Sequence, residues 1–244
     1  MFNIKETELL MTENSTKSVT ERGLLKRICI KNFRGFTLAE VLITLVIIGV
    51  IAAMTIPTLM NKTNNQELVS KLKKTYSTLS QATNKIIADE GNPQADIGGW
   101  ATSVPVIAEM YKKYLVNTRA CTNGMGNCLA VTYRSLDGNV ADAMQGAGNN
   151  IVLADGAVIA FWEGTFSDSC STTRYGTGGV CEEMIVDVNG AKGPNVIGKD
   201  TFAFDLTPNG LIPAGCSSGN CNTGSGISGW NCTCRALRQG SIDY

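Results

Sequence analysis

The chain has 244 residues, 21 acidic and 21 basic side chains, nine cysteines and no histidine. This length suits one domain with appended segments. The lack of histidine excludes Ser-His-Asp and Cys-His nucleophile pairs, the usual general base and most zinc sites. An enzyme is still possible on composition, but most of the common catalytic routes are closed.

The first 35 residues change in character along their length. Residues 1–20 are polar and rich in Thr, Glu and Ser, which predicts disorder. Residues 22–34 contain five basic side chains and no acidic one: Arg22, Lys26, Arg27, Lys31 and Arg34. Such a cluster before an apolar run stays on the cytoplasmic side of a membrane.

An apolar run follows, and Glu40 is the only charged residue between Phe36 and Met60. A helix of this length spans roughly the 30 Å of a hydrocarbon core, so the sequence predicts a single crossing. An acidic side chain inside it costs about 2.5–3.5 kcal/mol. A secretory signal peptide cut near Ala52 or Ala53 is the alternative, but a charge in the apolar core disfavours it.

The residues around this charge match a known pattern. Residues 34–43 read Arg34-Gly35-Phe36-Thr37-Leu38-Ala39-Glu40-Val41-Leu42-Ile43. This stretch resembles the processing and methylation motif of type IV pilins and type II secretion pseudopilins. The resemblance covers residues 34–90, and beyond them only the order of elements is similar.

The resemblance implies a set of roles. A membrane prepilin peptidase would cut between Gly35 and Phe36 and methylate the new amine of Phe36. Residues 1–35 would be a cytoplasmic leader, with Met11 as an alternative start. Glu40 would pair with the Phe36 amine of a neighbouring subunit and set the register between subunits, as buried polar groups can. Gly49 and Pro57 lie where this family often has helix-loosening residues, which predicts a kink.

Residues 61–90 predict the amphipathic half of the same helix, after a transmembrane half at 36–60. Apolar residues recur at steps of three and four. Gly91 and Pro93 mark the end of the helix. The predicted stripe is Leu68, Leu72, Tyr76, Leu79, Thr83, Ile86 and Ile87.

Residues 91–244 predict an extracytoplasmic globular domain. A short helix is expected at 103–116, and Asp155-Gly156 between apolar runs predicts a hairpin. The expected strands are 129–134, 151–154, 157–161, 184–188 and 201–206. A long helix on a small antiparallel sheet is an α+β fold, and the pilin resemblance implies the same arrangement.

Eight of the nine cysteines follow the apolar run, whereas Cys29 precedes it. Their even number and Gly/Ser/Asn-rich neighbours predict disulfides in an oxidising compartment, with buried free thiols as the alternative. The eight are Cys121, Cys128, Cys170, Cys181, Cys216, Cys221, Cys232 and Cys234.

The pairing of these cysteines cannot be derived from the sequence. Closeness in the sequence favours a disulfide between Cys121 and Cys128 and another between Cys170 and Cys181. Cys232 and Cys234 would then pair with Cys216 and Cys221. Residues 207–244 resemble in position the disulfide-bounded C-terminal loop of many pilins.

One further segment raises the question of a metal. Asp187 and Asn189 precede Gly190 at alternate positions, as oxygen ligands do in a calcium loop. An Asn-Gly turn between two strands is the alternative reading. Calcium is the only cofactor that the sequence suggests.

Together these features and the resemblance predict a structural subunit of a type IV pilus-like filament, and not an enzyme. The resemblance implies an inner-membrane protein of a bacterium that later enters a cell-surface or periplasmic filament. Its partners would be further pilin copies, the prepilin peptidase, an inner-membrane assembly platform and, before assembly, membrane lipid. Residues 36–244 have more acidic than basic side chains, so no nucleic-acid partner is expected.

Two other classes of function stay open. A single-pass anchored adhesin that never polymerises would keep its leader, and a secreted hydrolase would begin near Ala53. A type IV pilus, a secretion pseudopilus and a DNA-uptake fibre are not distinguished by the sequence.

Overall fold

The computed structural model describes residues 35–116, 119–121, 127–141, 149–224 and 228–244. The chain divides into two units, Met1–Val50 and Ile51–Tyr244. Helix α1 (Leu38–Glu90) begins in the first unit and ends in the second. A second helix, α2 (Val104–Tyr114), and a short helix, α3 (Thr233–Gln239), lie in the second unit.

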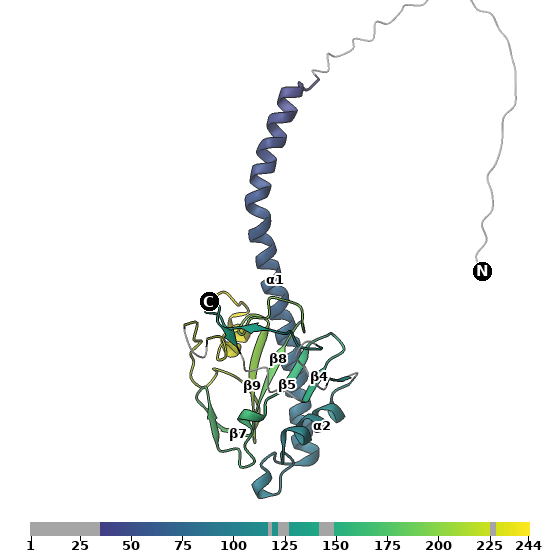
Figure 1. Ribbon diagram of the computed structural model, residues 1–244, viewed down its shortest axis with the longest axis vertical. Coiled ribbons are helices and arrows are strands. Elements are labelled where there is room, and N and C mark those ends of the chain that lie inside the picture. The colour runs from purple at the N-terminus through teal and green to yellow at the C-terminus, as the bar shows by residue number, and fades with distance from the viewer. Residues whose placement is uncertain (1–34, 117–118, 122–126, 142–148, 225–227) are drawn as a thin grey trace, which may run out of the picture. The chain divides into compact units, whose positions relative to one another are not determined.

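A six-stranded antiparallel sheet forms the centre of the second unit (Figure 1). Its order is β1 (Arg119–Cys121), β4 (Asn149–Val152), β5 (Val158–Phe161), β8 (Glu182–Asp187), β9 (Thr201–Thr207) and β10 (Gly210–Pro213). Two small two-stranded sheets pair β2 (Tyr133–Arg134) with β3 (Val140–Ala141) and β6 (Thr172–Arg174) with β7 (Thr177–Val180).

The hairpin predicted at Asp155-Gly156 is confirmed. Val152 lies opposite Val158 in the β4–β5 register. Gly156 has a φ of 89°, a left-handed conformation that glycine adopts without steric cost. The turn chemistry therefore sets the register of the two strands.

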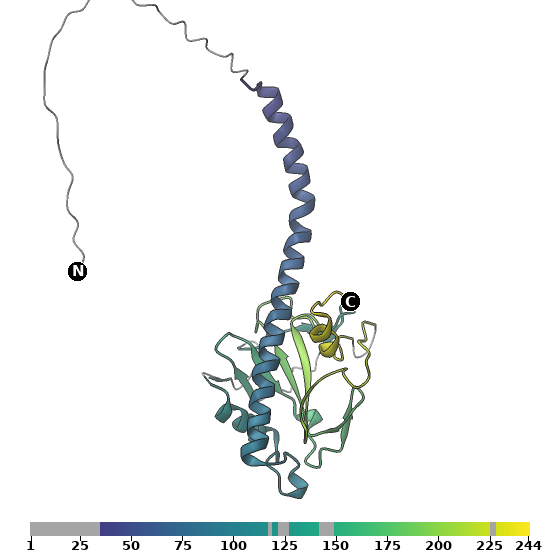
Figure 2. The same ribbon diagram turned by 180° about the vertical axis from the view of Figure 1, so that it is seen from behind.

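The second half of α1 crosses one face of this sheet, as Figure 2 shows from behind. Leu72, Leu79 and Ile86 are fully buried there. The ring of Tyr76 stacks on Phe204 of β9 with 5.6 Å between centroids. The three- and four-residue spacing of the sequence thus places one stripe of the helix against the sheet.

Helix α2 packs beside α1 against the same core. Ile107, Ala108 and Tyr111 of α2 are fully buried. The Tyr111 hydroxyl lies 2.5 Å from the Thr83 hydroxyl of α1, and Thr83 donates to the Leu79 carbonyl at 2.8 Å. This buried hydrogen-bond chain satisfies the polar groups at the contact between the two helices.

A second core covers the opposite face of the sheet. Ala160, Ile185 and Ala203 point into it from the strands. Leu129 and Trp230 pack over them from outside the sheet. Both faces of the sheet are therefore buried. For this reason the strands are apolar runs, in which apolar and polar residues do not strictly alternate.

The α+β prediction is confirmed, but two details of it are wrong. Only Tyr133–Arg134 of the strand expected at 129–134 is a strand, and it belongs to the small β2–β3 sheet. Leu129 and Ala130 are apolar because they fill the second core. Residues 207–244, for which no strand or helix was predicted, contain β10 and α3.

Candidate functional site

The Gly35–Phe36 bond lies before α1, outside any regular secondary structure. The Phe36 side chain is 86% exposed. A Cβ placed on Gly35 would meet no atom within 4 Å. Nothing in the described chain thus requires glycine at this position, and Gly35 and Phe36 are both exposed.

Thr37 and Glu40 form a capping box at the start of α1. The backbone N–H and the hydroxyl of Thr37 both donate to Oε2 of Glu40, each at 2.9 Å. The Glu40 N–H donates to the Thr37 hydroxyl oxygen at 3.2 Å. These reciprocal bonds satisfy N–H groups that a helix start leaves without partners.

This capping role of Glu40 was not predicted, although the Thr-x-x-Glu pattern at 37–40 is typical of a capping box. The cap uses one carboxylate oxygen. The other oxygen, Oε1, has no hydrogen-bond partner among the described residues. Glu40 can therefore cap its own helix and still accept from a group of another chain.

The first part of α1 exposes an apolar surface. No residue from Gly35 to Met60 is buried by the described chain. The helix is long and apolar enough to cross a membrane. An apolar surface of this extent is a site of contact with lipid or protein.

Gly49 and Pro57 both lie inside α1. No atom of the described chain comes within 4 Å of a Cβ placed on Gly49. Pro57 has no N–H, so the carbonyl of Ala53 lacks its usual helical donor. The kink expected at these residues stays a prediction.

A model of a known protein family matches this segment. The family model described as the prokaryotic N-terminal methylation motif matches residues 30–56. The chain carries the methylation motif of pilin-like proteins. This motif is the hallmark of type IV pilins and pseudopilins, and it indicates a structural rather than a catalytic protein. No curated protein and no solved structure matches the chain.

The motif and the apolar helix fit together in one chain. Gly35, Phe36, Glu40 and Gly49 lie inside the matched residues, whereas Pro57 lies just beyond them. The helix that begins two residues after Phe36 is long and apolar enough to cross a membrane. Both findings fit a single-pass, membrane-anchored, pilin-like protein.

The proposed calcium residues are held by donors of the chain itself. Buried Asp187 accepts from the Tyr133 hydroxyl at 2.6 Å and from the Asn189 N–H at 3.1 Å. The nearby Asp200 carboxylate accepts two backbone N–H groups at 2.6 and 2.7 Å. Calcium takes about six to eight oxygen ligands. No group of three or more Asp, Glu, Cys or His side chains among the described residues is arranged to hold a metal.

In the described structure the oxygens of Asp187 thus accept hydrogen bonds from Tyr133 and from the turn. Calcium binding there stays a prediction. If the ion binds, EDTA should lower the melting temperature of the protein and added calcium should restore it. Equal melting curves would leave only the turn.

All eight cysteines that follow the apolar run form disulfides. The bonds join Cys121 to Cys128, Cys170 to Cys181, Cys216 to Cys234 and Cys221 to Cys232. The first two pairs are those that closeness favoured, and the last two use the four cysteines left for the C-terminal region. Cys29 lies outside the described residues.

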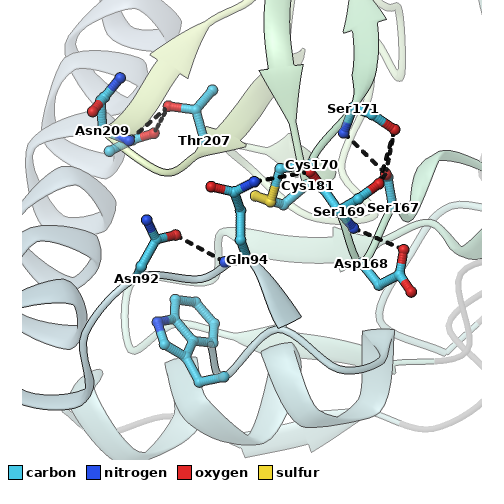
Figure 3. The surroundings of a disulfide bond; sticks show 12 residues. Asn92, Gln94, Ser167, Asp168, Ser169, Cys170, Ser171, Cys181, Thr207 and Asn209 are labelled. Atoms are coloured by element: carbon cyan, nitrogen blue, oxygen red, sulfur yellow. Dashed lines mark hydrogen bonds between the residues drawn. A yellow bond between two sulfur atoms is a disulfide. The ribbon is translucent and has the colours of Figure 1, made fainter. Parts of the chain in front are cut away.

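The Cys170–Cys181 disulfide lies beside a contact between the loop after α1 and the segment before β6 (Figure 3). The side-chain amide of Gln94 donates to the Ser169 carbonyl at 3.0 Å. Asn92 in turn accepts the Gln94 N–H at 2.9 Å. The loop after α1 is thus fastened to the segment that precedes β6.

A buried acidic pair lies on the face of the sheet that bears the second core. Glu183 of β8 is opposite Asp205 of β9, and both are fully buried. Arg174 forms an ion pair with Glu183 at 2.6 Å. Burial, followed by repulsion from Glu183, raises the pKa of Asp205 to about 8, although Thr177 and Arg174 act in the opposite direction. Asp205 is therefore largely protonated at neutral pH.

Proposed function

We propose that this chain is a structural subunit of a type IV pilus-like filament. Residues 1–35 are a cytoplasmic leader that the prepilin peptidase removes, and Phe36 becomes the methylated N-terminus. Residues 36–60 hold the subunit in the inner membrane before assembly. Residues 61–90 continue the spine helix into an extracytoplasmic domain, residues 91–244.

The observation that carries this proposal is the uncovered helix at the methylation motif. The motif ends at residue 56, and no residue up to Met60 is buried by the described chain. Lipid covers such a surface in a membrane, and helices of further copies would cover it in a filament. A filament subunit needs both environments in turn.

Glu40 would provide the register between subunits. Cleavage before Phe36 creates a charged amine near the helix start, and Oε1 of Glu40 has no partner among the described residues. An amine of a neighbouring copy at this oxygen would offset the desolvation of the carboxylate. In a single copy within lipid the same charge stays costly, which favours assembly.

The partners follow from this life cycle. The subunit would meet the prepilin peptidase, an inner-membrane assembly platform, membrane lipid and further copies of itself or other pilins. The final location would be a cell-surface or periplasmic filament. We expect no catalytic activity and no nucleic-acid partner.

Substitution of Gly35 tests the proposal. Gly35→Val should leave the precursor uncut in the membrane, because the peptidase needs a backbone without Cβ, whereas the described chain has room for the new side chain. Gly178→Val is the matched control, since a Cβ there also meets no atom within 4 Å. Immunoblots of the membrane and sheared-filament fractions measure precursor cleavage and filament yield. Wild-type filament yield from Gly35→Val would contradict the proposal.

A further inference from the structure

A polar cavity of about 800 Å³ lies between residues 215–222 and α3. Figure 1 shows α3 in yellow near the C-terminus. The polar side chains that line the cavity are Asn220, Asn222, Asn231, Arg235, Arg238 and Gln239. This volume is within the range of ligand sites and exceeds that of an inorganic ion.

Two nested disulfides fix the walls of this cavity. Cys216–Cys234 ties the loop to α3, and Cys221–Cys232 closes the loop again just before it. The Asn222 N–H also donates to the Asn231 side chain at 2.7 Å. Such a preformed wall lowers the ordering cost of binding a ligand.

The two arginines have donors without partners. Arg235 and Arg238 lie three residues apart, on one side of α3. Arg235 donates through Nε to Gln239 at 3.0 Å and stacks over Tyr244, with 5.5 Å to the ring centroid. Its terminal nitrogens and the whole Arg238 guanidinium form no ion pair or hydrogen bond among the described residues.

The charge of the cavity is one-sided. None of the described residues that line it is acidic. Two like charges three residues apart on a helix repel each other, and an anion between them would relieve this repulsion. Guanidinium groups bind carboxylates through two parallel hydrogen bonds.

We propose that this cavity binds an acidic saccharide, a short oligosaccharide with uronic-acid carboxylates. Arg235 and Arg238 would bind the carboxylates. The side-chain oxygens of Asn222, Asn231 and Gln239 already accept hydrogen bonds within the chain, and their NH₂ groups can donate to sugar hydroxyls. The described lining residues include no aromatic side chain and no lysine, so they offer no stacking platform of the kind that binds single-stranded nucleic acid.

Titration calorimetry of the full chain in detergent micelles tests this site, with trigalacturonate as the probe. Trigalacturonate should bind, and the same trisaccharide with its carboxylates methyl-esterified should bind at least about tenfold more weakly, since charged hydrogen bonds are lost. Inorganic phosphate at equal concentration should not displace it. Equal affinity for the ester, displacement by phosphate, or no binding of trigalacturonate would overturn the proposal.

Variants locate the binding. Arg235→Gln and Arg238→Gln should each weaken trigalacturonate binding about tenfold, and Arg238→Lys, which keeps the charge without the planar fork, should weaken it less. Lys199→Gln is the control, because it makes the same charge change at an exposed side chain outside the cavity. An equal loss in Lys199→Gln, or tighter binding of a single-stranded oligonucleotide than of trigalacturonate, would overturn the assignment.

Discussion

At the scale of single residues, Glu40 has two tasks that the sequence shows unequally. The charge in an apolar run is visible at once, whereas the Thr-x-x-Glu cap at residues 37–40 needs the helix start to be known. Gln can replace Glu in a capping box, but it has no charge. The two tasks can therefore be separated by substitution.

We predict that Glu40→Gln lowers the filament yield whereas Thr37→Val does not. Glu40→Gln should be cut normally, stay in the membrane and enter filaments poorly, because it keeps a cap but loses the charge. Thr37→Val removes the partner of the cap and keeps the charge, so filament yield should stay near that of the wild type. The ratio of sheared filament to membrane pool measures both.

Glu40→Val completes this set of variants. It loses the charge and the cap, yet it also removes the desolvation cost, so the protein should insert into the membrane at least as well. It should still fail to form filaments. Wild-type filament yield from Glu40→Val would show that the carboxylate does not set the register between subunits.

The raised pKa of Asp205 predicts that the stability of the fold depends on pH. Its pKa rises from about 3.9 in an unfolded chain to about 8 in the folded protein. A proton bound to this carboxyl group therefore stabilises the fold. This stabilisation is complete below about pH 4 and is lost as the pH rises to about 8. The groups that act on the carboxyl are Glu183, Arg174 and Thr177.

Asp205→Asn should remove this component of the pH dependence. Relative to the variant, the wild type should lose up to about 1.4 kcal/mol of unfolding free energy per pH unit between pH 5 and 8. Urea unfolding of the full chain in detergent at several pH values measures it. Asp96→Asn, at an exposed carboxyl, is the control, and curves parallel to the wild type for Asp205→Asn would contradict the assignment.

At the scale of elements, periodic segments could be predicted and cross-linked ones could not. The stripe of α1 and the β4–β5 hairpin carry local signals, a 3.6-residue period and an Asp-Gly turn. Helix α3 lies in Gly/Ser/Asn-rich sequence, where the disulfides from Cys216 and Cys221 hold it to the loop. The arginine cavity depends on that connectivity, so sequence reasoning could not find it.

The contact between α1 and α2 gives a prediction at this scale. Thr83→Val leaves the buried Tyr111 hydroxyl without its partner and should cost about 1–3 kcal/mol. Tyr111→Phe leaves Thr83 bonded to the Leu79 carbonyl, so it should cost less. The double variant should cost less than the sum of the two. Denaturant unfolding measures all three, and strictly additive losses would show that the two hydroxyls do not interact.

At the scale of the whole molecule, the chain combines a charged start, an uncovered apolar helix and a disulfide-bonded domain. The basic cluster at 22–34 belongs on the cytoplasmic side, whereas disulfides persist in an oxidising compartment. A crossing between the two satisfies both. The motif at 30–56 adds the place where the chain would be cut.

The mass of the intact protein purified from its native envelope tests the central claim most directly. We predict a chain that begins at Phe36, is heavier by one methyl group on its amine, and contains four disulfides among its eight remaining cysteines. A chain that still carries residues 1–35, or one that begins near Ala53, would contradict the proposal that this protein is a processed, pilin-like subunit.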